Sequence, residues 1–540
     1  MIRSRHISLI GLFFLFLAAC QAPTEEKSMQ LGEVYLEVSG SPAALPYFNK
    51  GLLLLHSFEY LDAANAFIKA QEIDKDFGMA YWGEAMAYNH NLWQRQLTKR
   101  AQDCFKRMGP TRARRLQLLK TDLEKDLFQG VEILYGTGPK DERDIAYKNH
   151  MQRLEKKYPG NQEVSALYAI SLLGTAKNGR DEELYNTCAQ ISRGILEENA
   201  NHPGALHYLI HALDDPEHAH KAVDAADRYA NVAPDAAHAL HMPSHIYIAL
   251  GRWNDVIQSN IASWNASMRR KTKYGMDGSY HSLSWLQYGL YQTGENEKAN
   301  ALLSKMRTYA DGRPSKEARA YLLAMKGAYM TENNIWNDAI ADIPIKVDDL
   351  SIMKRAENYF LEGMKEFHKK DVKLLSDVIK QLQKEKYTAS LNLSDKQSNM
   401  CSAGDVSNAL TSQLDIDMVT VIEYELEASL LKLHGQEKKA ISMLQKASAL
   451  DNTLSYAFGP PSIFKPASEA YAEALFDAEE FEEALAAYEM SLKRNPGRLI
   501  SLKGKFKTAT ALEETKMIQT LQQEKDSNLI TTKHTELLWN

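Results

Sequence analysis

Hydrophobic and polar residues recur along most of the chain with the spacing of amphipathic α-helices. The stretch from Leu45 to Asp76 is typical and reads as two such helices in succession. No segment shows the strict alternation of apolar and polar residues that marks a half-buried strand, or the Gly-rich turns of a sheet protein. The pattern therefore predicts an all-α protein.

The helices come in repeating pairs. Tyr47 and Gly51 mark the first helix of one pair, and Ala63, Phe67 and Ala70 mark the second. Small residues let two helices cross closely, and an aromatic ring fills the space beside them. Related patterns recur at Gly251-x-Trp253, Gly294, Gly435 and Phe481 to Pro496, with a looser pair over 318–345.

This pattern resembles the 34-residue tetratricopeptide repeat. The resemblance implies an α-solenoid, a right-handed superhelix of helix pairs. At 540 residues the chain is too long for one compact core. A polar stretch over 386–412 and a loop at 311–315 lead us to predict an N-terminal array over 33–310 and a C-terminal array over 311–540.

Composition supports the helical prediction and limits the classes of partner that we expect the protein to bind. Hydrophobic residues make up 44% of the chain and charged residues 25%, with only 28 Gly and 16 Pro. The net charge of −6 and the lack of a long basic block argue against nucleic-acid binding.

The first twenty residues have the layout of a signal peptide. Arg3 and Arg5 precede an apolar run that ends in Ala18-Ala19-Cys20. This ending resembles the bacterial lipobox, which implies cleavage after residue 19 and acylation of Cys20. We expect a signal peptide over 1–19, a lipidated tether over 20–32 and anchoring in the outer membrane.

Histidines supply the candidate chemistry. Nine of the 16 lie between residues 202 and 281. His207 and His211 are four apart, and His241 and His245 repeat that spacing 34 residues later. In the repeat register, helix positions 2, 5 and 9 face the concave wall of a tetratricopeptide array. The resemblance therefore implies one patch on that wall, made of His207, His211, His238, His241, His245 and His281.

Three hypotheses follow for this patch. It forms a groove that binds a protein, a peptide or a small ligand. Alternatively, His207, His211, His241 and His245 hold Zn²⁺ or Cu²⁺, because imidazoles at i and i+4 share one helix face. The third hypothesis is a set of buried, hydrogen-bonded structural histidines. Asp214 is a candidate partner behind the ligands, or simply the acidic end of its helix.

Pro243 lies inside the helix that carries His241 and His245. A proline there removes one helical hydrogen bond and predicts a kink that frees the carbonyl of Ala239.

The histidine motifs themselves resemble a family. The segments from His202-Pro203-Gly204 to His211-Ala212, and from His241-Met242-Pro243 to Tyr247, are similar to those of bacterial tetratricopeptide-repeat lipoproteins. Gly459-Pro460-Pro461 fits the same family, which implies a fold and no particular activity. In the C-terminal array, Glu425, Glu469 and Glu473 take groove-facing positions and are further ligand-binding candidates.

No nucleophile elbow, phosphate loop, dinucleotide fingerprint or HExxH motif occurs in the sequence. We therefore expect a binding lipoprotein rather than an enzyme, with the membrane and a protein or peptide as its partners. The alternatives are a histidine-dependent metal-binding protein or metalloenzyme, and an accessory protein of a surface nutrient or glycan uptake system.

Overall fold

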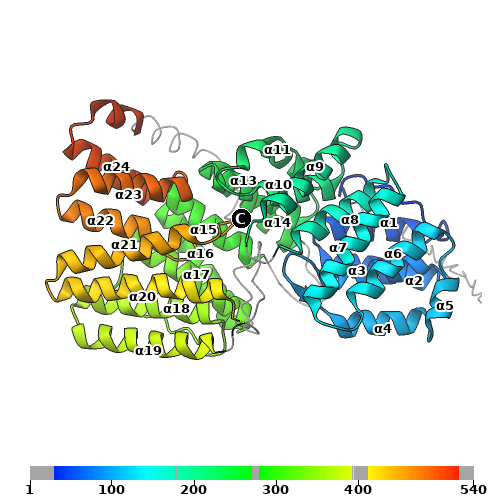
Figure 1. Ribbon diagram of the computed structural model, residues 1–540, viewed down its shortest axis with the longest axis horizontal. Helices are drawn as coiled ribbons and strands as arrows, with labels where there is room; N and C mark the ends of the chain where they lie inside the picture. The colour runs from blue at the N-terminus through cyan, green and yellow to red at the C-terminus, as the bar shows by residue number, and fades with distance from the viewer. Residues whose placement is uncertain (1–28, 177–178, 270–278, 392, 394–410, 522–540) are drawn as a thin grey trace, which may run out of the picture.

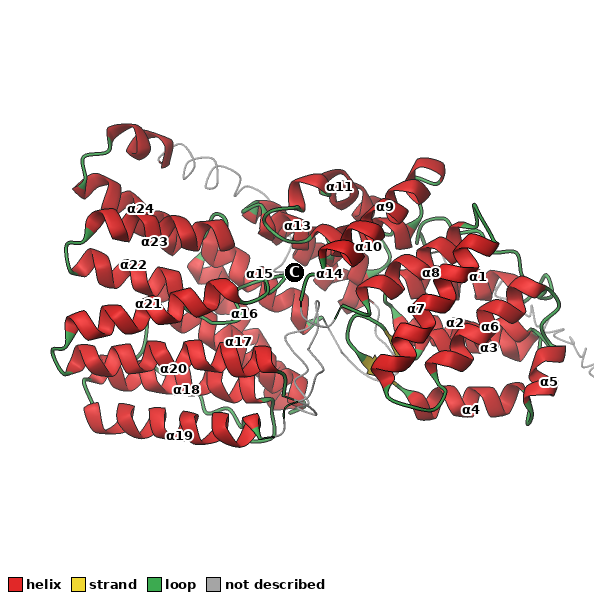
Figure 2. Cartoon of the chain, viewed as in Figure 1, coloured by secondary structure: helices red, strands yellow, loops and turns green. Residues whose placement is uncertain are grey.

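A computed structural model describes residues 29–176, 179–269, 279–391, 393 and 411–521. These residues are almost entirely α-helical, as predicted (Figure 2). A short hairpin of β1 (Asn89–His90) and β2 (Arg95–Gln96) forms the one sheet in the described part of the chain. The signal-peptide prediction and Cys20 lie outside the described residues. No helix within the described ranges is long and apolar enough to cross a membrane.

The N-terminal half builds one series of packed helices. They are α1 (Leu45–His56), α2 (Tyr60–Ile73), α3 (Gly78–Ala87), α4 (Thr98–Met108), α5 (Arg112–Gln117), α6 (Asp122–Leu134), α7 (Lys140–Lys157), α8 (Gln162–Leu173), α9 (Glu182–Glu198), α10 (Pro203–Leu213) and α11 (Val223–Val232).

The series continues through a broken helix into the C-terminal half. Its members are α12 (Ala237–His241), α13 (Pro243–Ala249), α14 (Trp253–Arg269), α15 (Tyr280–Gln292), α16 (Asn296–Gly312), α17 (Lys316–Asn333), α18 (Ile352–Lys369), α19 (Val372–Ser390), α20 (Gln413–Leu433), α21 (Glu437–Thr453), α22 (Ala467–Asp477), α23 (Phe481–Arg494) and α24 (Leu499–Ala511).

Small residues and inserted rings explain the pairing, as the repeat pattern predicts. α1 packs on α2, and α2 packs on α3. The ring of Phe67 lies between the two flanking helices: a Cβ added at Gly51 would come within 2.8 Å of it, and one at Gly83 within 2.3 Å. Tyr488 of α23 similarly covers Gly504 of α24. Packed helix pairs of this kind define an all-α fold of the tetratricopeptide type.

One predicted pair is incomplete. α17 ends at Asn333, and Asn334 adopts a left-handed conformation with φ of 51°. The following residues to 351 form turns instead of the second helix expected within 318–345. A left-handed residue stops a helix, which explains the end of α17. Lys370 ends α18 in the same way and α19 follows at once, so Asn334 does not by itself account for the missing second helix.

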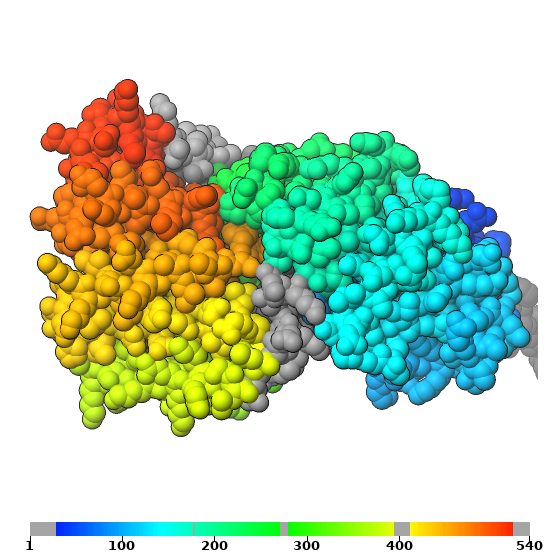
Figure 3. Space-filling view, in the orientation of Figure 1, coloured from blue at the N-terminus to red at the C-terminus, as the bar shows by residue number. Residues whose placement is uncertain are grey.

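The buried apolar residues divide into two main cores. One runs from Leu31 to Val256 and includes Trp285, and the other runs from Ile257 to Ala467. The two cores therefore meet at α14 and α15. Figure 3 shows the corresponding lobes, one coloured blue to green and the other green to red. The division at residue 310 remains a prediction.

The N-terminal series curves until its first helix meets its later ones (Figure 1). α1 contacts α10 directly, and the Nδ1 atom of His56 lies 2.8 Å from the hydroxyl of Tyr208. The fit is close, because a Cβ on Gly204 would lie 2.4 Å from the same imidazole. This contact brings the end of α1 against the histidine-bearing helices.

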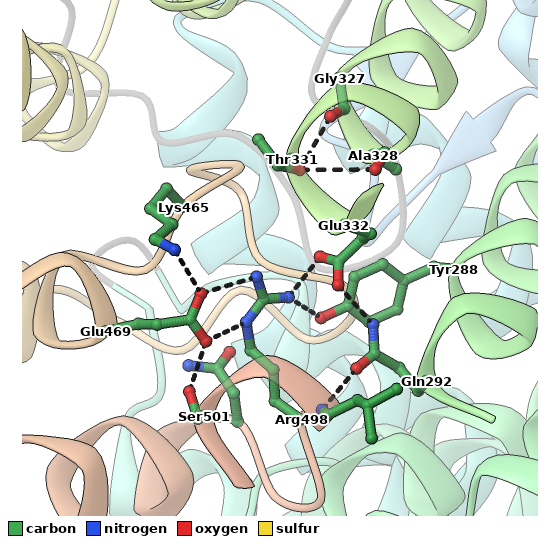
Figure 4. A network of polar contacts seen from close by, with 12 residues as sticks. Tyr288, Gln292, Gly327, Ala328, Thr331, Glu332, Lys465, Glu469, Arg498 and Ser501 are labelled. Carbon is green, nitrogen blue, oxygen red and sulfur yellow. Dashed lines mark hydrogen bonds and ion pairs between the residues drawn. The ribbon is translucent and has the colours of Figure 1, made fainter. Parts of the chain in front are cut away.

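The C-terminal series closes through a buried guanidinium (Figure 4). Arg498, just before α24, is fully buried and pairs with Glu469 at 2.8 Å and with Glu332 at 2.6 Å. It also donates to the hydroxyl of Tyr288 at 2.8 Å. One side chain thus ties α15, α17 and α22 to the start of α24.

Candidate metal centre

The six predicted histidines lie together where the two cores meet. His207 and His211 come from α10, His238 and His241 from α12, His245 from α13 and His281 from α15. Neighbouring rings are separated by 4.5 Å to 6.1 Å between centroids, with His241 and His281 the nearest pair. The register deduced from the repeat therefore placed these residues on a common wall.

The wall is not an open groove at this point. His207, His211, His241 and His245 are at most 1% exposed. His238 and His281 are partly exposed, but their Nε2 atoms are buried. Four of the rings are therefore out of reach of a polypeptide in this conformation.

The candidate ligand atoms form overlapping sets of three. Atoms of His207, His211 and His238 all lie within 4.8 Å of one another, and so do atoms of His241, His245 and His281. His211 and His245 form a third such set with Asp214, which joins the first two. We call the two histidine sets the first triad and the second triad.

The Nδ1 atoms of these rings already have acceptors. His207 Nδ1 lies 2.7 Å from the carbonyl oxygen of His56, and His241 Nδ1 lies 2.7 Å from Oδ1 of Asn260. The amide nitrogen of Asn260 donates to Val256, which fixes Oδ1 toward the imidazole. Both Nδ1 atoms must therefore donate, and each Nε2 carries a lone pair. Metal-binding histidines typically have this arrangement.

Asp214 plays the same part for both triads. Its Oδ2 lies 3.4 Å from His211 Nδ1 and 3.2 Å from His245 Nδ1. The carboxylate is buried at the end of α10. This location fits one of the two roles expected from the sequence, that of a partner behind the candidate metal ligands. Asp215 points elsewhere and pairs with Arg180 at 3.0 Å.

The Nε2 atoms of these histidines face one another, and too few hydrogen-bond donors are present to satisfy them. His207 Nε2 and His211 Nε2 are 3.1 Å apart, although both Nδ1 atoms face acceptors. Two lone pairs at this distance repel unless a proton or a cation lies between them. Nε2 of His238, His241 and His281 makes no hydrogen bond within the described ranges. Buried polar atoms without partners are rare in folded proteins, and a bound ion or water is one explanation for them.

Burial keeps the imidazoles neutral. It lowers the pKa of His211, His245 and His281 to about 3, and it lowers the pKa of His207, His238 and His241 well below the usual range. Burial also raises the pKa of Asp214 to about 6. Neutral imidazole is the form that binds metals, so the ligands need not lose protons near neutral pH.

The predicted kink at Pro243 separates α12 from α13. Helix α12 ends at His241, and α13 begins at Pro243. The hydroxyl of Ser244 donates to the carbonyl of His241 at 2.6 Å across the break. The kink lets one chain segment present His238, His241 and His245 to different sides of the cluster.

Aromatic rings enclose the cluster, and sequence reasoning missed them. Phe58 lies 4.2 Å from the ring of His207, and Trp285 lies 4.7 Å from both His241 and His245. Phe58 has a left-handed backbone with φ of 55°, an unusual conformation for a bulky residue. Such strain clusters at functional sites. A positive φ leaves no mark in the sequence.

A further buried trio of similar composition behaves differently. His56 Nε2 lies 2.7 Å from Glu163, and His202 Nε2 lies 3.2 Å from the same carboxylate. Because His202 Nδ1 accepts from the backbone N–H of Ala205, its Nε2 must carry the proton. These contacts lower the pKa of Glu163 to about 2. The trio connects α1, α8 and α10 through the hydrogen bond of His56 to Glu163, while Oε1 of Glu163 and Nε2 of His202 make no hydrogen bond among the described residues.

The three predicted glutamates do not join the histidines. Glu469 pairs with Arg498, Glu473 pairs with Lys465 at 2.5 Å, and Glu425 is buried on α20. Burial and neighbouring acids raise the pKa of Glu425 well above its usual range. No set of metal-capable atoms found among the described residues combines these acids with a histidine of the cluster.

Comparison with known proteins adds little to this description. No family model matches the chain, and no curated protein matches it. Solved structures with similar helical arrangements include yeast Tom70, with 12% identity and a TM-score of 0.31 over 88% of this chain and 89% of that one. The P58(IPK) TPR domain has 12% identity and a TM-score of 0.22, over 88% and 99% of the two chains. A chain of Naa15/Naa10 bound to HypK-THB has 13% identity and a TM-score of 0.23, over 90% and 73%.

Proposed function

We propose that this protein binds transition-metal ions, Zn²⁺ or copper, in the two histidine triads. The observation that carries the proposal is the orientation of the imidazoles. Nδ1 of His207 and His241 is committed to acceptors, while buried Nε2 atoms converge without donors. Imidazole nitrogen suits zinc and copper, and a site with three ligands leaves a coordination position open.

The same burial favours an ion over a peptide as the direct ligand of the histidines. A peptide in the groove would need accessible side chains, and four of the six rings are at most 1% exposed. Binding of a protein or peptide elsewhere on the repeat surface remains compatible with a metal in the cluster.

Metal analysis tests the proposal. The full chain, purified without a histidine tag or chelator, is expected to contain zinc or copper, or to take up one ion per triad on titration. Replacing His207 or His241 with leucine removes a nitrogen donor and should abolish uptake by its triad. The measurement is elemental analysis by mass spectrometry, with melting curves to confirm folding.

His150→Leu is the matched control. His150 is also buried, but it belongs to α7 and its Nε2 contacts the carbonyl of Asp126. Its replacement should leave the metal content unchanged. Saturable uptake that survives both His207→Leu and His241→Leu would refute the assignment, and so would a folded wild-type chain that takes up neither metal.

We propose further that Cys20 anchors the protein to the outer membrane. The support is the lipobox-like sequence Leu17-Ala18-Ala19-Cys20 after a basic and apolar leader. Cys20→Ser should move the protein from the membrane fraction to the soluble envelope fraction, as immunoblotting would show. Unchanged membrane association of this variant would contradict lipid anchoring. A role beside a nutrient or glycan uptake system is a further proposal, which rests on that location alone.

A further inference from the structure

A cavity of about 280 Å³ lies between the N-terminal and C-terminal halves, beside the second triad. Its wall is formed by α15, α17, α18, the start of α20 and the segment 454–466 between α21 and α22, together with residues of the N-terminal half that include Leu92, Leu173 and Tyr185. The volume is near the lower end of the range for small-molecule sites. His281 and Trp285 line both this cavity and the metal centre.

The segment 454–466 is seated tightly against the helices. A Cβ on Gly459 would lie 2.5 Å from the ring of Trp285, and the ring of Phe464 packs where a Cβ on Gly327 would lie. Arg494 donates to the carbonyls of Leu454 and Ser455 at 3.0 Å each. The cavity is therefore held open by fixed walls.

Part of the wall is aromatic. Rings from the helices and from the inserted segment surround the space: Trp285, Tyr288, Tyr321, Tyr456, Phe458 and Phe464. Such walls stack on flat apolar groups and attract cations held over a ring face.

Two acceptor atoms in the wall lack donors. The amide nitrogen of Gln287 donates to the carbonyl of Met325 at 3.1 Å, which fixes the orientation of the amide. Its Oε1 is buried and makes no hydrogen bond in the part of the chain that the structure describes. Glu357 accepts from Lys354 through Oε1 at 2.6 Å, and its buried Oε2 is without a partner among the same residues. Leaving such atoms unmatched costs about 1 to 3 kcal/mol each, so the site is built to receive hydrogen-bond donors.

We infer that this cavity binds a small aromatic molecule carrying an amine or hydroxyl group. The ring fits the aromatic wall, and the N–H or O–H donates to Gln287 Oε1 or Glu357 Oε2. The inference goes beyond metal binding and does not depend on it, because neither acceptor belongs to a triad. When a metal occupies the second triad, a molecule in this cavity lies next to a metal ligand, His281.

Titration of the full chain with four probes tests the inference. Tyramine and 2-phenylethanol have a ring and a donor, toluene has the ring alone, and benzoate has a ring with acceptors only. Binding is followed by tryptophan fluorescence, since Trp285 lines the cavity, and by calorimetry. Tyramine and 2-phenylethanol should bind saturably, and benzoate at least tenfold more weakly.

Substitutions locate the binding. Ala324→Phe fills the cavity and should abolish binding of every probe, whereas Ala486→Phe adds the same ring at an exposed site and should change nothing. Should Ala324→Phe fail to fold, Ala328→Leu fills the same wall with less bulk. Gln287→Met preserves volume, and we expect it to weaken tyramine about tenfold while leaving toluene unaffected.

The outcomes separate this inference from the metal proposal. Tyramine binding by a chain that takes up no metal supports the cavity site and refutes only the metal centre. A metal-loaded chain that shows no saturable tyramine binding up to about 10 mM overturns the cavity site alone. Equal affinity of wild type and Ala324→Phe also overturns it.

Discussion

Asp214 contacts one histidine of each triad. Its carboxylate faces Nδ1 of His211 and of His245, on two different helices. Carboxylates in this position hold the ring and increase its basicity as a ligand. The two triads therefore share a single support and should be coupled.

Replacing Asp214 tests that coupling. Asp214→Asn keeps the shape, but a neutral amide oxygen is a weaker acceptor for the two imidazoles than a charged carboxylate oxygen. We expect metal affinity to fall about 10- to 100-fold at both triads, measured by competition with a chelator of known affinity. The exposed Asp224→Asn change on α11 should have no effect. A loss confined to one triad would contradict a shared role.

The neutral histidines also predict an acid-sensitive fold. In the unfolded chain their pKa is about 6.5, whereas burial lowers the pKa of His211, His245 and His281 to about 3. Between these values the unfolded state binds more protons. The free energy of unfolding should therefore fall with pH from about 6.5 toward 3, by about 1.4 kcal/mol per pH unit for each histidine.

Asp214 works in the opposite direction over part of this window. Its pKa is raised from 3.8 to about 6, so its contribution favours the folded state as pH falls through 6. The net slope should therefore correspond to about two protons between pH 6 and 4 from these four groups. Urea denaturation of metal-free protein from pH 7 to 5 measures it. His281→Leu should reduce the slope by one proton, and a slope that this change leaves unaltered would refute the assignment.

At this scale, sequence reasoning found the clustered histidines but not their surroundings. The 34-residue spacing of His207 and His241 was enough to place six histidines on one wall. Phe58 and Asn260 could not be found the same way, because their positions depend on how α1 and α14 pack against other helices. Ordinary hydrophobic and amide residues carry no sequence signal of proximity to a metal ligand.

At the level of elements, the helix break around Met242 affects how His241 and His245 are oriented in the cluster. Pro243 cannot donate to the carbonyl of Ala239, and α12 gives way to α13 there. His241 and His245 stay neighbours across the break, with ring centroids 5.1 Å apart against 4.8 Å for His207 and His211. The ring of His241 also contacts His281, and Nδ1 of His245 lies 3.2 Å from Asp214.

Pro243→Ala restores the missing backbone donor. We expect unchanged or higher thermal stability together with metal affinity at least about tenfold lower at the second triad, measured by chelator competition. Pro203→Ala is the control, since Pro203 occupies the first turn of α10, where no helical donor is lost. Equal metal affinity of Pro243→Ala and wild type would show that the break has no part in ligand placement.

The helices themselves were largely predictable. The alternation of small residues with Phe67 or Tyr488 identifies pairs because that packing is local in sequence. The prediction for the region after α17 was wrong, because a left-handed Asn334 and a run of turns stand where the second helix was expected. Local periodicity does not reveal where a helix is stopped by a single backbone conformation.

At the scale of the whole molecule, buried polar clusters close both series of helices. Arg498 and Tyr288 are 210 residues apart in sequence, and His56 and Tyr208 are 152 apart. The curvature that brings them together accumulates over many helix pairs. Sequence alone could not supply it, because each pair contributes a rotation that depends on side-chain packing.

At this scale, the clearest test is a substitution of the buried Arg498. Arg498→Met leaves Glu332 and Glu469 buried without their cation, and we expect a loss of about 3 to 5 kcal/mol in unfolding free energy. Lys69→Met, which removes a surface pair with Glu72, should cost less than about 1 kcal/mol. Chemical denaturation compares them, and equal losses would mean that the Arg498 cluster does not hold the C-terminal series closed.

The contact between α1 and α10 has a consequence for how this chain reaches its native state. Open repeat arrays fold by nucleating anywhere and extending to neighbours, and they tolerate loss of a terminal repeat. Here the last turn of α1 packs only after α8 and α10 are in place, across 152 residues of intervening chain. Such distant contacts slow folding and bind the early and late helices into one cooperative unit. A chain synthesised from its N-terminus can pack α1 on α2 at once, but it has to wait for α10 before the contacts of its first helix are complete.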